Sequence, residues 1–155
     1  MPGVNSKSAG GYGGSSPRAG TESARSFGDL RRQEAVSAKR LYAIDARCTP
    51  RSPVTDVGQL TDVAIAAVSA GGGHVLDASH VIFPNGAITL VLILAESHLS
   101  IHTWPEENLI AIDLFSCGAI DGDRVVAELV DGLRLDRASA TTIERGLPPS
   151  GPAAF

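Results

Sequence analysis

The sequence has few of the residues that several common classes of protein require. Its 155 residues include only two cysteines, and Cys48 and Cys117 are 69 residues apart with no Cys-x-x-Cys motif. This excludes a disulfide framework and a four-cysteine metal site. The longest apolar run, at residues 90–95, is far shorter than the roughly 18 to 20 residues of a membrane-spanning helix. We therefore expect no membrane span.

Basic residues are scarce outside the N-terminal segment. Residues 1–40 contain seven Lys or Arg against three Asp or Glu, whereas residues 41–155 contain six against fourteen. Nucleic-acid binding needs Lys and Arg clustered against phosphates, so the acidic remainder argues against that function. The N-terminus also lacks the apolar stretch of a secretory signal. We expect a cytoplasmic protein that binds neither nucleic acid nor a membrane.

Glycine and serine are concentrated at the start of the chain. Residues 1–28 contain seven Gly and six Ser and almost no large aliphatic side chains. Such a composition buries too little apolar surface to offset the entropy lost on folding. We predict a disordered, basic, Gly/Ser-rich extension over residues 1–40, one folded domain over 41–146 and a flexible tail over 147–155.

The folded segment contains both strand and helix patterns. Strands are predicted at residues 41–45, 74–83, 89–95, 109–115 and 139–145, and the continuous apolar run in 89–95 is typical of a strand buried on both faces. Helical spacing of apolar residues predicts two helices, at 55–70 and 121–135, with Thr55 and Asp123 as N-caps. The order β-α-β-β-β-α-β predicts an α+β two-layer sandwich, with two helices on one face of a mostly antiparallel sheet.

Polar and reactive side chains are concentrated in residues 95–106, AESHLSIHTWPE, with Cys117 further on. A strand that exposes His98, Ser100 and His102 to solvent explains this pattern most simply. A zinc site on the two histidines would need a helix, which the following proline and the β-branched neighbours disfavour. A nucleophilic pair of Cys117 and His102 would need a hairpin that brings the two segments together.

The sequence ESHLSIHTWPE at residues 96–106, followed by AIDLFSCG at 111–118, resembles the signature of the prokaryotic S-adenosylmethionine decarboxylase proenzymes. The resemblance extends over about residues 41–146 and leaves out 1–40. In that family the chain cuts itself before the serine of a Glu-Ser-His sequence, and the serine becomes a pyruvoyl group. The resemblance therefore places a cut between Glu96 and Ser97. It implies a pyruvoyl cofactor generated from Ser97, with no external cofactor and no metal.

The resemblance also implies roles in processing and catalysis. Ser97 would become the group that forms a Schiff base with the substrate, and His102 would act as a base during processing. Cys117 would protonate the decarboxylated carbon, and Thr89 would assist processing. Since Ser97 and His102 are five residues apart, a regular strand would place them on opposite faces. We therefore expect a turn or bulge between them.

Four further positions match substrate-binding residues of the family. Phe83 and Trp104 would lie against the adenine, and Glu106 would accept hydrogen bonds from the ribose hydroxyls. Leu99 would meet the adenine edge through its backbone. Two departures concern the pocket: residues 45–48 lack the aromatic-Gly-Cys arrangement of the family, and the Pro-Gly pair after Phe83 is displaced by one residue.

The resemblance implies a decarboxylase that converts S-adenosylmethionine to the aminopropyl donor for spermidine and releases CO₂. It also implies a homodimer of cleaved protomers, with the site built across the interface. One alternative is the same self-cleavage with ornithine or arginine as substrate, against which the nucleoside-binding residues Phe83, Trp104 and Glu106 argue. Another is an inactive homologue that serves as a regulatory subunit, against which the intact processing residues argue.

Overall fold

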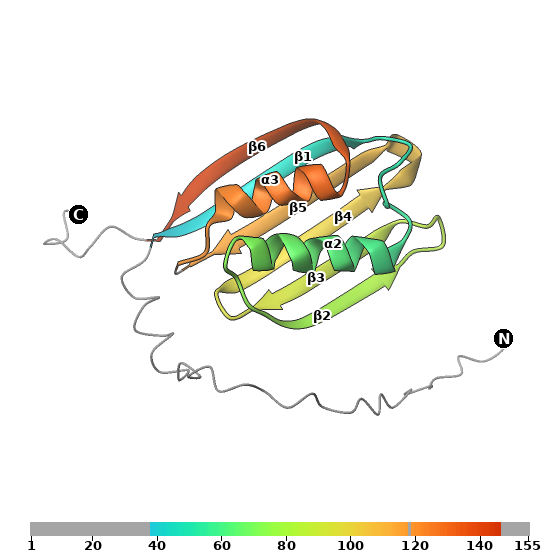
Figure 1. The fold of residues 1–155 in the computed structure, drawn as a ribbon. Helices are drawn as coiled ribbons and strands as arrows, with labels where there is room; N and C mark the ends of the chain where they lie inside the picture. The colour runs from blue at the N-terminus through green and yellow to red at the C-terminus, as the bar shows by residue number, and fades with distance from the viewer. Residues whose placement is uncertain (1–37, 118, 147–155) are drawn as a thin grey trace, which may run out of the picture.

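A six-stranded antiparallel sheet carries two helices on one of its faces (Figure 1) in this computed structural model, which describes residues 38–117 and 119–146. The spatial order of the strands in this described part is β2-β3-β4-β5-β1-β6. This confirms the predicted α+β two-layer sandwich. The strands are β1 (Lys39–Cys48), β2 (Val75–Ile82), β3 (Ile88–Leu94), β4 (Ser97–Trp104), β5 (Leu109–Ser116) and β6 (Leu135–Arg145); the helices are α2 (Val57–Ala70), α3 (Gly122–Gly132) and the short 3₁₀ helix η1 (Pro105–Glu107).

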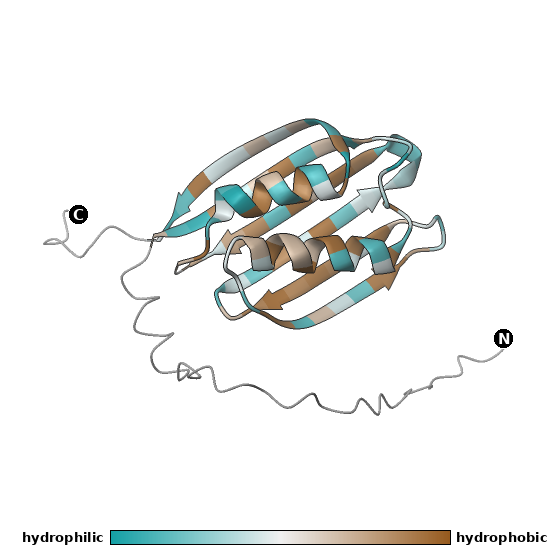
Figure 2. Cartoon of the chain, in the orientation of Figure 1, coloured by the Kyte–Doolittle hydropathy of each residue, from teal (hydrophilic) through white to brown (hydrophobic). Residues whose placement is uncertain are grey.

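The hydrophobic core lies between the helices and the sheet. Alternate residues of β3, β4 and β5 face the helices, as the period of two in a strand requires. Figure 2 shows the long hydrophobic stretch of β3 beneath α2. The largest fully buried side chains come from four strands, both helices and the residue that follows α3: Ile44, Leu60, Ile88, Leu90, Leu92, Leu99, Ile101, Ile110, Ile112, Leu114, Leu129 and Leu133.

Each α-helix begins after an aspartate. The Asp56 carboxylate accepts a hydrogen bond from the backbone N–H of Gln59, and the Asp121 carboxylate caps α3 in the same way. Hydrogen bonds from the backbone and side chain of Gln59 hold the pKa of Asp56 below its ordinary value. The predicted caps, Thr55 and Asp123, are therefore wrong by one and two residues.

The sheet has one strand more than the predicted order. Residues 97–104 form β4, which pairs with β3 and β5 in continuous register, so the turn or bulge expected between Ser97 and His102 is absent. The predicted order does not count this strand, but the expectation of a strand with His98, Ser100 and His102 on one face is confirmed, since Leu99 and Ile101 alternate with them and face the helices. Strands β1 and β6 are also longer than predicted, and β1 starts at Lys39, two residues before the expected domain boundary.

The second face of the sheet, which we call the open face, carries no helix within the described residues (Figure 1). It presents Thr89, Val91 and Ile93 of β3, His98, Ser100, His102 and Trp104 of β4, and Ala111, Asp113 and Phe115 of β5. Ile93 is 45% exposed, whereas Leu90 and Leu92 are fully buried. The prediction that β3 is buried on both faces is thus wrong for the single chain.

Most of the predicted extension, residues 1–37, and the predicted tail, residues 147–155, lie outside the described residues. In the part that the structure describes, neither helix has the length and the apolar character needed to cross a membrane.

Helix α3 packs closely against β1 at Gly122. A Cβ atom at this position would overlap the ring of Tyr42, which is buried. We expect Gly122→Ala to lower the free energy of unfolding by about 1–3 kcal/mol, because an overpacked core must shift to make room. Urea denaturation measures this change.

The control for this prediction is the same substitution in a Tyr42→Leu background, which removes the overlapping atoms. There the cost of Gly122→Ala should fall below about 1 kcal/mol, because the two sites are coupled through this contact. An equal cost in both backgrounds would show that the close approach is not its cause.

Candidate active site

The Glu96–Ser97 peptide bond lies where a tight hairpin turn joins β3 to β4. The carbonyl oxygen of Glu96 accepts hydrogen bonds from the backbone N–H of Cys117 (3.1 Å) and from its Sγ (2.7 Å). Ser97 has a φ of +155°, a backbone conformation that residues with a Cβ rarely adopt. Two donors on one carbonyl draw electrons from its carbon, so this peptide bond is both polarised and strained.

The side chain of Glu96 is held by a residue outside the hairpin. The backbone N–H of His74 donates to Oε2 of Glu96 (3.0 Å), and Nδ1 of His74 lies 2.7 Å from Oε1. The carbonyl oxygen of His74 accepts from the N–H of Ala95 (2.9 Å). Glu96 is therefore held at its backbone carbonyl by Cys117 and at its side chain by His74.

Oγ of Ser97 lies 3.4 Å from Nδ1 of His98, which is a residue of the open face. The His98 ring packs against Phe115, with 5.9 Å between ring centroids, and the guanidinium of Arg145 lies 6.0 Å from the Phe115 centroid. These residues border a hollow of about 410 Å³ that Leu41, Ser100 and Asp113 complete.

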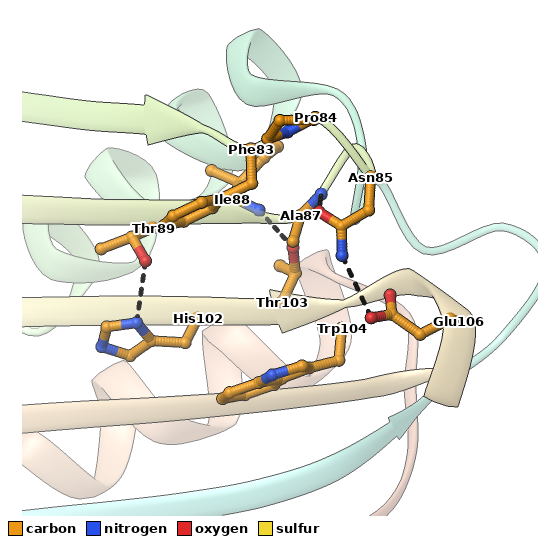
Figure 3. Close-up of a pocket in the computed structure, with 10 residues that line it drawn as sticks. All are labelled: Phe83, Pro84, Asn85, Ala87, Ile88, Thr89, His102, Thr103, Trp104 and Glu106. Atoms are coloured by element: carbon orange, nitrogen blue, oxygen red, sulfur yellow. Dashed lines mark hydrogen bonds between the residues drawn. The ribbon is translucent and has the colours of Figure 1, made fainter.

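A second group of predicted residues lies at the other end of β3 and β4, around a pocket of about 500 Å³. Figure 3 shows Phe83 above and Trp104 below the space between the strands, with Thr89 and His102 deeper along them. Oγ1 of Thr89 lies 3.0 Å from Nδ1 of His102, and the ring centroids of His102 and Trp104 are 6.3 Å apart. Aromatic faces, a histidine and a carboxylate, Glu106, thus line one pocket.

A polar contact joins the two walls of this pocket. Nδ2 of Asn85, in the β2–β3 turn, donates to Oε1 of Glu106 on η1 at 3.1 Å (Figure 3). Oδ1 of Asn85 accepts from the backbone N–H of Ala87 at 3.2 Å. Since that N–H fixes which end of the amide is oxygen, the NH₂ group must face Glu106. Asn85 therefore orients the carboxylate.

The structure separates the predicted site residues into two clusters at opposite ends of β4. We call Glu96, Ser97 and Cys117 the cleavage cluster, and Phe83, Thr89, His102, Trp104 and Glu106 the pocket cluster. Ser97 and His102 are five residues apart on a regular strand, which is a distance of about 16 Å. Within one chain, His102 cannot touch Ser97.

Leu99, the remaining predicted residue, lies between the clusters. Its side chain is fully buried on the helix-facing side, and its backbone lies between β3 and β5. Its contact with an adenine edge stays a prediction.

Metal binding and the second cysteine can also be examined in the structure. Because β4 is a strand, His98 and His102 are about 13 Å apart along it, too far to bind one ion. Among the described residues, no three His, Cys, Asp or Glu side chains gather where they could hold a metal ion. Burial raises the pKa of the Cys48 thiol, which makes Cys48 a poorer nucleophile at neutral pH.

Two site residues were not found from the sequence. His74 was expected only as the start of a strand, and Asn85 only as part of a turn. Both act on glutamates more than twenty residues away in the chain, 22 for His74 and 21 for Asn85. No local pattern records such contacts.

Fold and site together define the class of this protein: an α+β two-layer sandwich that carries a polarised Glu-Ser peptide and an aromatic pocket on one sheet. The chain belongs to the S-adenosylmethionine decarboxylase family, whose model matches residues 40–146.

Among its relatives is an S-adenosylmethionine decarboxylase proenzyme from Caldanaerobacter subterraneus, 34% identical over 112 residues that cover 69% of this chain and 83% of the relative. Another proenzyme of the same name, from Pyrococcus horikoshii, is 27% identical over 68% of this chain and 77% of its own. The crystal structure of the adenosylmethionine decarboxylase from Aquifex aeolicus superposes with a TM-score of 0.66 at 24% identity, over 76% of this chain and 98% of that one. This last likeness shows the shared fold.

Proposed function

We propose that this chain is a proenzyme that cleaves itself between Glu96 and Ser97 and then decarboxylates S-adenosylmethionine with a pyruvoyl group made from Ser97. The observation that carries the proposal is the Glu96 carbonyl, held by two donors from Cys117 beside a strained serine. Membership of the decarboxylase family supports the substrate and the reaction. A cytoplasmic location remains a prediction.

Self-cleavage begins at the polarised carbonyl. Ser97 Oγ attacks the carbonyl carbon of Glu96, and the two donors from Cys117 stabilise the negative charge that develops on the oxygen. The C–N bond breaks, so an ester replaces the amide and the amino group of Ser97 is released. Relief of the strain at Ser97 favours this step.

The chain separates by elimination. A base, which we assign to His102, removes the α-proton of Ser97, and the Glu96 carboxylate leaves with the electrons of the C–O bond. The dehydroalanine that remains becomes an imine, and water replaces its nitrogen as ammonia to leave a ketone. The residues present fit this group, because its precursor, Ser97, starts β4 beside the polarised carbonyl.

The ketone supplies an electrophile for the substrate amine and an acceptor for the electrons released with CO₂. The chain's own residues bind and protonate the substrate. Phe83 and Trp104 hold the adenine ring and Glu106 accepts from the ribose hydroxyls, while the Cys117 thiol delivers a proton to the carbon that loses CO₂. Ornithine and arginine have no ring for the aromatic walls, so the pocket favours the nucleoside.

The first prediction concerns the cleaved bond. Intact-mass spectrometry of the purified protein should reveal chains of residues 1–96 and 97–155, whose masses sum to the proenzyme plus water minus ammonia. Ser97→Ala should leave one full-length chain, because no hydroxyl attacks. Ser79→Ala, at an exposed position of β2, should cleave normally. An uncleaved protein with Ser97 intact, or a Ser97→Ala chain that is cut at this bond, contradicts the proposal.

The second prediction concerns the carboxylate that binds ribose. We expect Asn85→Asp to raise KM for S-adenosylmethionine about tenfold, since repulsion from a second carboxylate replaces the hydrogen bond that orients Glu106. Self-cleavage should be unchanged. Glu106→Ala should raise KM by at least as much, and Glu107→Ala, its exposed neighbour, should not. Release of CO₂ gives both constants, and an unchanged KM in Glu106→Ala would end the ribose-binding assignment.

The distance between the two clusters supports a homodimer with a shared site. His102 lies about 16 Å from Ser97 in its own chain, yet the elimination needs a base at the Ser97 α-proton. A two-fold axis near the middle of β4 would bring the pocket cluster of one protomer to the cleavage cluster of its partner. The symmetry would create two equivalent sites in the dimer. It would also cover Val91 and Ile93 of the open face, which accounts for the apolar character of β3.

The third prediction tests this shared site by complementation. Chains that carry Ser97→Ala and chains that carry His102→Ala are expressed together with tags of different mass. In a mixed dimer the His102→Ala chain meets the partner's His102 and should be cleaved, although it is uncleaved when expressed alone. The Ser97→Ala chain should stay intact in both cases. If neither chain is cleaved in the mixture, the site does not cross an interface.

A further inference from the structure

Three of the polar groups of His74 contact the hairpin that contains the proposed cleavage bond. Its N–H and its ring Nδ1 bind the two carboxylate oxygens of Glu96, at 3.0 and 2.7 Å. Its carbonyl oxygen accepts from the N–H of Ala95 at 2.9 Å. Neither the fold nor the chemistry of cleavage described above assigns a role to this residue.

The burial of the two side chains is unequal. The side chain of Glu96 is 11% exposed, whereas that of His74 is 72% exposed. A nearly buried carboxylate needs hydrogen-bond donors to replace the water that it has lost. His74 supplies one donor to each of the two carboxylate oxygens of Glu96. Because its ring is mostly in solvent, His74 contributes little to core packing, and its polar contacts are its main effect on the hairpin.

The loop that carries His74 is firmly supported. Gly73 donates from its N–H to the carbonyl oxygen of Val68 on α2 at 2.9 Å. A Cβ at Gly73 would overlap Val68 and Ile120, so the loop packs closely against both. His74 therefore contacts Glu96 from a base that is fixed to α2 and to the segment before α3.

The contact with Glu96 determines which ring nitrogen of His74 acts as the donor. An ionised carboxylate has no hydrogen to donate, so Nδ1 of His74 carries the proton and donates to Glu96. Neutral and charged imidazole both provide this N–H. The contact therefore depends on a donor at the Nδ1 position rather than on the charge of the ring.

We propose that His74 is a positioning residue for self-cleavage: it anchors the Glu96 side chain so that the Glu96 carbonyl stays against its two donors and Ser97 keeps its strained backbone. The inference rests on the proposed cleavage between Glu96 and Ser97. A strained conformation persists only where its surroundings over-determine it. Here Cys117 holds the carbonyl and His74 holds the side chain, so loss of either lets the turn relax.

The test compares substitutions that keep or remove the donor at the Nδ1 position. The amide nitrogen of asparagine occupies the place of Nδ1, and that of glutamine the place of Nε2. We expect His74→Ala and His74→Gln to slow conversion of the proenzyme into its two chains by about tenfold to a hundredfold. His74→Asn should cleave within about threefold of the native rate, and His80→Ala, an exposed histidine on β2, at the native rate.

Hydroxylamine identifies the step that is slowed, because it cleaves esters far faster than amides. In His102→Ala the ester should accumulate and hydroxylamine should cut it. In His74→Ala formation of the ester is itself the slow step, so the ester should not accumulate and hydroxylamine should add nothing. Equal cleavage rates for the asparagine and glutamine variants, a native rate for the alanine variant, or rescue of that variant by hydroxylamine would each overturn the inference. Failure of the native chain to cleave would instead overturn the proposed function.

Discussion

The register of β4 is the constraint on which the rest of the molecule depends. This strand pairs with β3 along one edge and with β5 along the other, without a shift. Its alternation sends Leu99 and Ile101 into the core and His98 and His102 to the open face. Because a bulge would break both sets of strand pairs, Ser97 and His102 stay at opposite ends of a rigid strand. The strand pairing that builds the core therefore keeps the cleavage cluster and the pocket cluster apart within one chain.

In the function we propose, that division gives each end of β4 a different task. At the turn, the donors on the Glu96 carbonyl and the backbone of Ser97 prepare a peptide bond for attack. At the other end, the proposal assigns the pocket lined by aromatic rings and the Glu106 carboxylate to the nucleoside. The strain at Ser97 lowers the stability of the fold. The hydrophobic core between the two helices and the sheet offsets this loss. A second copy of the chain joins the two tasks in the arrangement we propose.

The fold class and most elements could be predicted from the sequence, since α3 and β5 have strong apolar periodicity. The alternation of polar and apolar residues in β4 indicated a strand with one exposed face, but not the neighbours with which it pairs. The composition of β3 indicated two buried faces, but a single sequence does not say which molecule covers the second. The candidate site residues were predicted through their resemblance to a family motif, whereas their division into two clusters follows from strand register. His74 and Asn85 act across turns, and only the folded chain brings them to their glutamates.

Reductive trapping tests the central claim most directly. The purified protein is incubated with S-adenosylmethionine, ornithine or arginine together with cyanoborohydride, which reduces a bond between a ketone and an amine to a stable adduct. The account predicts that only S-adenosylmethionine adds mass to the chain of residues 97–155, at its first residue, and that the chain of residues 1–96 is unchanged. An adduct formed by ornithine or arginine instead, or no adduct on a cleaved protein, would contradict it.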